Sequence, residues 1–88
     1  MKKKLKIINK LGLHARASSK FVEITNKYKS EIFIEFNDIK VNAKSILGLL
    51  SLAISFNDEF EIFIEGEDES EALNEIINIV NNKFGEPE

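Results

Sequence analysis

The chain has 88 residues, enough for a single domain over residues 1–88 and too few for a second. Hydrophobic residues make up 43% and charged residues 31%, which is typical of a folded globular protein and excludes a disordered chain. Cysteine is absent, so disulfides, thiol nucleophiles and thiolate metal sites are excluded as well. The basic start leads into only a few apolar residues, and no apolar run has the roughly 18 residues of a membrane span. We therefore expect a cytoplasmic protein without a signal peptide and without membrane insertion.

The net charge of −3 is unevenly distributed along the chain. Residues 1–44 carry a balance of +7, and residues 45–88 carry a balance of −10. Two interpretations are open: the basic and acidic elements neutralise each other in the fold, or the basic half forms a patch for an acidic partner. Nucleic acid is a poor candidate for that partner, because the basic half lacks the arginine-rich and aromatic surface of a nucleic-acid-binding sheet.

Hydrophobic periodicity predicts the order strand, helix, strand, strand, apolar segment, strand, helix. The strands are expected at residues 4–8, 31–36, 39–43 and 59–64, with Asn37-Asp38 as the two-residue turn of a hairpin. The first helix is expected at residues 14–29, with its apolar residues on one face. The last helix is expected to begin at the apparent capping box Asp68-Glu69-Ser70-Glu71 and to stop at Gly85 and Pro87.

The apolar segment at residues 45–54 is typical of a short helix, for which Ser45 is a good N-cap. Helical spacing places Leu49, Leu52 and Ala53 on one side of this segment. It places Ile46, Leu47 and Leu50 on another side, and the two sets do not easily face one core. Either the segment is fully buried, or the second set forms an exposed patch for a partner.

His14 is the only histidine, so a site built from several histidines is impossible, and we expect no metal and no cofactor. It follows the turn Leu11-Gly12-Leu13 and begins a predicted helix, whose N-terminus offers unpaired N–H groups and the positive end of the dipole. Arg16 adds a guanidinium that can bind phosphate. Nearby positive charge favours a neutral, nucleophilic imidazole. These features fit a histidine that accepts a phosphoryl group; the alternative is a histidine that caps the helix or lies on the surface.

Residues 11–18, LGLHARAS, resemble the active-site signature of HPr, the histidine-containing phosphocarrier family of the bacterial phosphoenolpyruvate:sugar phosphotransferase system. Residues 41–52, VNAKSILGLLSL, are similar to that family's second signature, around its regulatory serine, and residues 65–73 resemble the entry to its final helix. The resemblance covers the whole chain. It implies an α+β open-faced sandwich, in which a four-stranded antiparallel sheet carries three helices on one face in the order βαββαβα.

The resemblance also implies a function. His14 would accept a phosphoryl group at Nδ1 from phosphorylated Enzyme I and pass it to Enzyme IIA components. Arg16 would stabilise the phosphate, and the backbone amides of Ala15, Arg16 and Ala17 would complete the phosphate pocket. The protein would be a monomer and a transferase component that needs a partner at each step, not a self-sufficient enzyme.

Ser45 matches the serine that an ATP-dependent kinase/phosphorylase modifies in some bacteria, a role compatible with helix capping. Phosphate at a helix N-terminus would change the structure little and would repel acidic partners. The resemblance assigns the apolar set of residues 45–54 to the interface with Enzyme I and other partners, surrounded by a basic rim. The interface residues are Ile46, Leu47 and Leu50, and the rim residues are Arg16, Lys20, Lys27 and Lys44.

Ala17 departs from the signature, which usually has proline after the arginine, a residue that suits the first turn of a helix. We predict that phosphorylation is retained. Two alternative functions are a nitrogen-type regulatory phosphorelay without sugar transport, favoured by residues 9–13 and 82–86, and a binding-only module controlled through Ser45. Intact His14 and Arg16 argue against the binding-only module. A ferredoxin-like domain that binds RNA or a small molecule is a more distant alternative, because a stacking surface is lacking.

Overall fold

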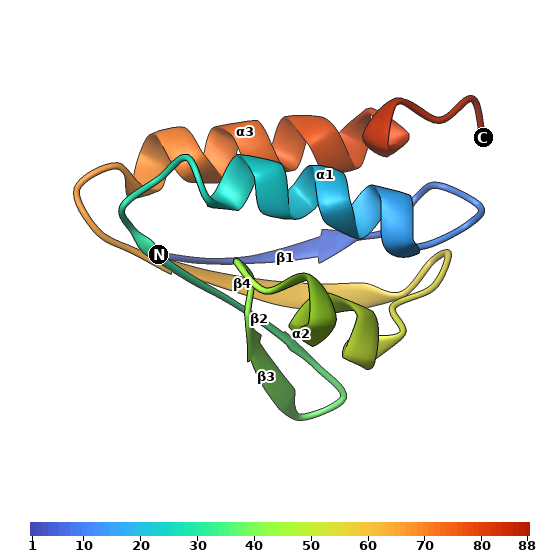
Figure 1. Cartoon of the computed structure of the whole chain (residues 1–88), viewed down its shortest axis with the longest axis horizontal. Coiled ribbons are helices and arrows are strands. Elements are labelled where there is room, and N and C mark those ends of the chain that lie inside the picture. The colour runs from blue at the N-terminus through green and yellow to red at the C-terminus, as the bar shows by residue number, and fades with distance from the viewer.

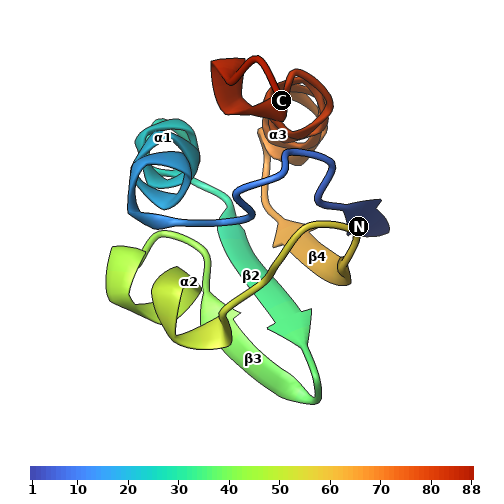
Figure 2. The same ribbon diagram turned by 90° about the vertical axis from the view of Figure 1, so that its right-hand side faces the viewer.

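A computed structural model, which describes residues 1–88, contains a four-stranded antiparallel sheet with three helices on one face (Figures 1 and 2). The strands β1 (Lys2–Lys6), β2 (Glu31–Phe36), β3 (Ile39–Asn42) and β4 (Glu59–Glu65) lie in the order β1-β4-β2-β3. The helices are α1 (Ala15–Thr25), α2 (Ile46–Leu52) and α3 (Glu69–Asn81), and the short 3₁₀ turn η1 (Lys83–Gly85) follows them. The predicted α+β architecture and the order βαββαβα are confirmed.

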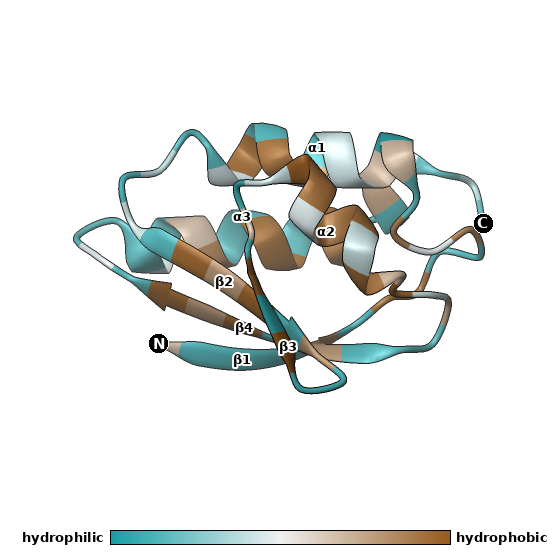
Figure 3. Cartoon of the chain, turned by 60° about the horizontal axis from the view of Figure 1, so that its bottom comes forward, coloured by the Kyte–Doolittle hydropathy of each residue, from teal (hydrophilic) through white to brown (hydrophobic).

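The core lies between the sheet and the helices, because strands and helices alike bury one apolar side (Figure 3). Alternating residues of the two central strands point inward and are at most 2% exposed: Ile32, Ile34, Phe60, Ile62 and Ile64. The helices α1 and α3 cover them with side chains spaced three or four residues apart: Ala17, Phe21, Ala72, Ile76 and Val80. None of the helices is long and apolar enough to cross a membrane.

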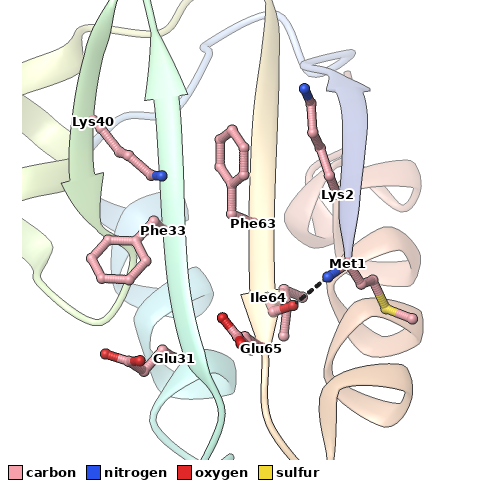
Figure 4. A pocket seen from close by; sticks show the side chains of 8 residues that line it. All are labelled: Met1, Lys2, Glu31, Phe33, Lys40, Phe63, Ile64 and Glu65. Atoms are coloured by element: carbon pink, nitrogen blue, oxygen red, sulfur yellow. Dashed lines mark hydrogen bonds between the residues drawn. The ribbon is translucent and has the colours of Figure 1, made fainter.

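The other face of the sheet carries charged and aromatic side chains (Figure 4). Phe33 of β2 lies opposite Phe63 of β4, and the Lys40 ammonium lies 4.1 Å from the centre of the Phe63 ring. Lys2 of β1 lies 5.7 Å from the same ring and 3.5 Å from the carboxylate of Glu61. These contacts cover the aromatic rings with the alkyl chains and charges of lysines, as amphipathic side chains commonly do.

The uneven charge of the chain is partly neutralised by the fold. Three ion pairs join the basic half to the acidic half: Lys2–Glu61, Lys10–Glu88 and Lys27–Glu75. In addition, β1 with its lysines pairs along its length with the acidic β4. The neutralisation interpretation therefore accounts for much of the charge pattern, although exposed pairs of this kind contribute only about 0–1 kcal/mol each.

Two predicted element boundaries are wrong. The first strand covers residues 2–6 instead of 4–8, because its partner β4 begins at Glu59. The backbone of Ile7 instead forms hydrogen bonds with Asn57 and Asp58, in the turn that precedes β4. The first helix ends at Thr25, and the turn that follows it has i→i−3 hydrogen bonds. Side-chain bonds from Thr25 to the carbonyl of Ala43 and from Asn26 to that of Val22 compete with the helical pattern there.

The predicted capping box of the last helix is also wrong. Asp68 stands at the N-cap of α3, but its side chain makes no capping hydrogen bond. Its carboxylate accepts hydrogen bonds from the hydroxyl and amide of Ser30 and from the amide of Lys29. The Ser30 hydroxyl, followed by the Lys29 amide, lowers the pKa of Asp68 against the opposing effect of burial. Asp68 thus joins the loop after α1 to the start of α3.

Candidate functional site

His14 is the N-cap of α1, with extended backbone angles of φ −75° and ψ −177°. Its Nδ1 accepts a hydrogen bond of 3.2 Å from the backbone N–H of Arg16. The side chain is 29% exposed, so the imidazole lies at the surface and at the positive end of the helix dipole. The interpretation of His14 as a helix cap is confirmed. The phosphoryl-acceptor interpretation stays a prediction, and a ring nitrogen at a helix N-terminus is compatible with it.

The loop before His14 is held rigidly. Asn9 is fully buried, its side-chain Nδ2 donates to the carbonyl of Gly12 at 2.8 Å, and the Gly12 amide donates back to the Asn9 carbonyl. Gly12 has φ +70°, a left-handed conformation that favours glycine. Leu13 then donates to the carbonyl of Ile54 at 2.9 Å, which ties the loop to the segment after α2. Together these bonds fix the direction in which the chain enters α1.

Glu86, near the end of the chain, contacts the other ring nitrogen of His14. Its Oε2 lies 2.5 Å from Nε2 of His14, and its Oε1 accepts a hydrogen bond of 3.0 Å from Asn9. Burial raises the pKa of the Glu86 carboxyl, but the hydrogen bonds from His14 and Asn9 and the charge of Lys20 outweigh burial and lower it. Residues 86–88 therefore lie against the loop before His14 (residues 9–13), where Lys10 also donates its amide to the carbonyl of Glu88.

Arg16 is exposed, and its guanidinium makes no ion pair or hydrogen bond within the chain. It contributes with His14 to one surface depression, lined by Lys10, Leu11, His14, Arg16, Glu86, Pro87 and Glu88. The first-turn residue Ala15 is exposed and Ala17 is fully buried. The depression holds the carboxylates of Glu86 and Glu88 together with a histidine ring, a free guanidinium and the Lys10 side chain. The guanidinium and the nearby helix N-terminus are groups that bind an anion such as phosphate.

Ser45 is the N-cap of α2, as the sequence predicts. Its Oγ accepts a hydrogen bond of 3.0 Å from the amide of Gly48. Of the residues on the predicted inner side of this helix, Leu49 and Leu52 are buried, whereas Ala53 is exposed and ends the helix with φ +52°. The Ser45 hydroxyl thus lies at the first end of α2, and Ile54, which binds Leu13 in the loop before His14, follows the other end.

The apolar side chains of α2 form the exposed patch that was one of the two sequence interpretations. Ile46 is 37% exposed, Leu47 is 77% exposed and Leu50 is 36% exposed. Beyond Met1 and Ile39, which are exposed at the ends of strands, sequence reasoning missed two exposed hydrophobic residues, Leu11 at 72% and Phe56 at 46%. Both lie in loops, where helical periodicity gives no signal.

The lysines of the expected basic rim are all engaged within the chain. Lys20 donates to the carbonyl of Phe84 at 2.7 Å, and Lys44 donates to the carbonyl of Tyr28 at 2.7 Å. Lys27 forms an ion pair with Glu75 of α3. Arg16 lies in the first turn of α1, whereas Lys27 follows the end of this helix at Thr25. The structure therefore places Arg16 next to His14 in the chain and Lys27 beyond the opposite end of α1.

No group of three or more histidine, cysteine or acidic side chains is arranged to hold a metal ion. The only histidine instead lies between a helix N-terminus and a carboxylate, with each of its ring nitrogens engaged by a different partner. The fold and this site define a small α+β protein with one partly exposed histidine at a helix N-terminus.

Comparison with known proteins identifies the family. Residues 1–82 match the family model described as the HPr component phosphorylation site of the phosphotransferase system. The chain is 46% identical over 88 residues to the phosphocarrier protein HPr of Neisseria meningitidis serogroup B, covering 100% of this chain and 99% of that protein. This chain belongs to the HPr family of phosphocarrier proteins.

Solved structures agree with this assignment. HPr from Thermoanaerobacter tengcongensis matches with a TM-score of 0.96 and 40% identity, covering 100% of this chain and 99% of that chain. Crh of Bacillus subtilis, a catabolite repression protein seen as an intertwined dimer with a swapped domain, matches with a TM-score of 0.75. Crh is 42% identical, and the match covers 92% of this chain and 93% of that one.

Proposed function

We propose that this protein accepts a phosphoryl group on Nδ1 of His14 from phosphorylated Enzyme I and transfers it to Enzyme IIA proteins. The observation that carries the proposal is the position of Nδ1 at the N-terminus of α1, in a surface depression that the unpaired guanidinium of Arg16 also lines. Membership in the HPr family supports the same chemistry. The relay takes place in the cytoplasm, needs no cofactor and makes the protein a transferase component.

The transfer step needs no proton to move. The lone pair of Nδ1 releases the Arg16 amide and attacks the phosphorus of the donor phosphohistidine. The donor P–N bond breaks, and its electron pair returns to the donor imidazole. The Arg16 guanidinium and the first-turn amides of Ala15, Arg16 and Ala17 hold the phosphoryl oxygens. Reversal of the same steps passes the group to the acceptor.

The partner interface consists of the exposed apolar side chains of α2, Ile46, Leu47 and Leu50. A relay protein has to release each partner quickly, which a small apolar patch with charged neighbours permits. Arg16, Lys20, Lys27 and Lys44 supply the positive charge around this patch for acidic partners, with Lys27 the most distant from His14. The protein works as a monomer; the swapped dimer of Crh makes molecular mass in solution a direct check.

Phosphorylation of Ser45 by an HPr kinase/phosphorylase regulates docking. The Ser45 hydroxyl already faces the N-terminus of α2, so a phosphate there leaves the fold unchanged and adds a dianion beside the apolar patch. Incubation with the kinase and ATP should add one phosphoryl group to the wild type and none to Ser45→Ala. Ser51→Ala is the matched control, since Ser51 is an exposed serine of the same helix. Uptake by Ser45→Ala equal to that of the wild type would reject Ser45 as the target.

A regulatory phosphorelay without sugar transport is the second candidate function. It shares the chemistry of His14 and differs only in the IIA partner, and the similarity to Crh, a protein of catabolite repression, favours it. A binding-only module is less well supported, because it has no use for an exposed His14 next to a free Arg16. Transfer to sugar-type and nitrogen-type IIA proteins in parallel separates the two phosphorelays.

The test of the proposed function is phosphotransfer. The protein is incubated with Enzyme I, Mg²⁺ and phosphoenolpyruvate, and intact mass is measured. We expect one added phosphoryl group that is labile in acid and stable in base, and none in His14→Ala. Ser19→Ala, at an exposed serine of α1, and a known HPr, run in parallel, control for folding and for active Enzyme I. A folded wild-type protein that stays unmodified while the known HPr is charged would reject phosphoryl carriage and favour a binding-only role.

A further inference from the structure

The end of the chain is directed to the active site by an unusual backbone. Lys83, Phe84 and Gly85 have φ values of +58°, +56° and +79°, a left-handed turn that is costly for the two residues with side chains. The turn is kept because the Phe84 side chain is 99% buried and the Lys20 ammonium binds the Phe84 carbonyl. This anchored turn reverses the chain after α3 and brings Glu86 to His14.

The carboxylate of Glu86 is held at both oxygens. Oε1 accepts from Asn9 and Oε2 lies 2.5 Å from Nε2 of His14, and the side chain is only 13% exposed. Asn9 uses both protons of its Nδ2, one for Glu86 and one for Gly12, while its buried Oδ1 has no partner. A buried amide with an unpaired oxygen is unfavourable. This arrangement indicates that Asn9 is oriented for its two donor bonds, one of which fixes Glu86.

The two partners of His14 together assign its tautomer. A carboxylate only accepts hydrogen bonds, so Nε2 opposite Glu86 must carry a proton. Nδ1 accepts from the Arg16 amide, so it must present its lone pair. A neutral imidazole has one N–H proton, and here it is on Nε2. The nitrogen that faces the helix N-terminus is thereby left free as the nucleophile.

We propose that Glu86 is a positioning residue that keeps the proton on Nε2 of His14 before, during and after phosphoryl transfer; this inference rests on the proposed function. With Nε2 protonated, attack by Nδ1 yields a phosphoimidazolium, and onward transfer releases a neutral imidazole as the leaving group. If Nε2 loses its proton, the leaving group is an imidazole anion, which departs far less readily. Glu86 thus favours both the correct nitrogen and the reactive form of the phosphohistidine.

The surroundings of His14 fit this role. The charged groups near the ring are Glu86 and Glu88 from the end of the chain, Lys10 from the loop, and Arg16 and Lys20 from α1. Among them, Glu86 is the one that touches the ring. Glu88 forms an ion pair with Lys10 at 3.6 Å and is exposed. It is a glutamate only two residues after Glu86, but it does not contact the His14 ring. Glu88→Ala is therefore a matched control for Glu86→Ala.

The first measurement is the ¹⁵N-edited proton spectrum of the unphosphorylated protein. An Nε2 proton that is hydrogen-bonded to Glu86 exchanges slowly with water and gives a visible signal. We expect this signal in the wild type and in Glu88→Ala, its loss in Glu86→Ala, and its partial retention in Glu86→Gln, whose side-chain oxygen still accepts. Thermal unfolding of each variant shows that the fold is intact. A signal that persists unchanged in Glu86→Ala overturns the proposal.

The second measurement is transfer from the charged protein to IIA under single-turnover conditions. We expect Glu86→Ala to be slower by about tenfold, below the roughly hundredfold effect of a direct acid–base residue. Glu86→Gln should recover part of this loss, and Glu88→Ala should match the wild type. If the wild type takes up a phosphoryl group and Glu86→Ala matches it in uptake and onward transfer, the proposed role of Glu86 is overturned while the proposed function stands. If the wild type takes up no phosphoryl group, the proposed function and the role of Glu86 in transfer fail together.

Discussion

The ring of Phe84 lies 6.5 Å from the ring of Phe21, tilted by 43°. Phe21 belongs to the buried face of α1, and Phe84 follows α3 in a left-handed turn. This contact joins the helix that begins at His14 to the segment that carries Glu86. One aromatic pair in the core therefore determines where the end of the chain can reach at the surface.

Replacing Phe84 tests this connection. Phe84→Ala removes a fully buried ring, and we expect the free energy of unfolding to fall by about 3–5 kcal/mol in denaturant titrations. The anchor of residues 86–88 is lost at the same time, so the amide of Lys10, which donates to Glu88, should exchange faster with solvent. Phe84→Leu retains most of the apolar volume and should show a smaller effect on both measurements. Unchanged exchange at Lys10 in folded Phe84→Ala would contradict this view.

Gly12 and Gly85 offer a matched pair of positions, each one or two residues in the chain from a member of the His14–Glu86 pair. Both have positive φ, but a Cβ on Gly12 would lie 2.9 Å from the backbone oxygen of Ile54, whereas at Gly85 it would meet only the Lys20 ammonium at 3.4 Å. We expect Gly85→Ala to lower the free energy of unfolding by about 1–2 kcal/mol, the cost of a left-handed alanine. Gly12→Ala should cost clearly more, because backbone must also move. Equal losses in chemical denaturation would show that the contact with Ile54 relaxes freely.

The main elements and the position of His14 at the start of a helix could be predicted from the sequence because their signals are local. Alternation fixes the strands, and a histidine and an arginine two residues apart at a helix start depend on nothing distant. The patch of Ile46, Leu47 and Leu50 follows from helical spacing, although the sequence alone left burial and exposure equally open. Ser45 was recognisable as an N-cap for the same local reason.

Glu86 could not be found in this way. It lies 72 residues from His14 along the chain, and a single carboxylate after Gly85 has no local pattern that sets it apart from its neighbours. The failed capping box at Asp68 has a similar cause. Its pattern was correct, but Ser30, 38 residues away, offers a hydroxyl and an amide that compete successfully for the carboxylate. In both cases the side chain's partner lies far away in the sequence, so a local pattern cannot reveal the contact.

Ala53 provides a prediction about stability away from the site. It ends α2 in the left-handed conformation, with φ +52°, and its side chain is exposed. Glycine at this position removes the strain of a Cβ at the cost of more freedom in the unfolded chain. We expect Ala53→Gly to raise the free energy of unfolding by about 0.5–1 kcal/mol. Ala72→Gly, at a buried position within α3, should lower the free energy of unfolding by about 1 kcal/mol. If Ala53→Gly also lowered the free energy of unfolding, the interpretation of Ala53 would be refuted.

Tyr28 is the only tyrosine, which allows its ionisation to be followed directly through phenolate absorbance. Its hydrogen bond to Glu75 is the main cause that raises the pKa of Tyr28 from 10.0 to about 12, with smaller contributions from burial and from the negative charge of Glu75. Because the folded state favours the neutral phenol, this contribution to stability is complete below pH 10 and is lost as the pH rises toward about 12.

We therefore expect the phenolate of the folded wild type to form near pH 12, and the midpoint in Glu75→Gln to return toward 10. The free energy of unfolding of the wild type should fall more steeply between pH 10 and 12 than that of Tyr28→Phe, which has no phenol to ionise. Lys27→Met, which removes the other partner of the Glu75 carboxylate, is the control for loss of the ion pair alone. An ordinary midpoint near 10 in the folded wild type would show that Glu75 does not hold the Tyr28 proton in solution.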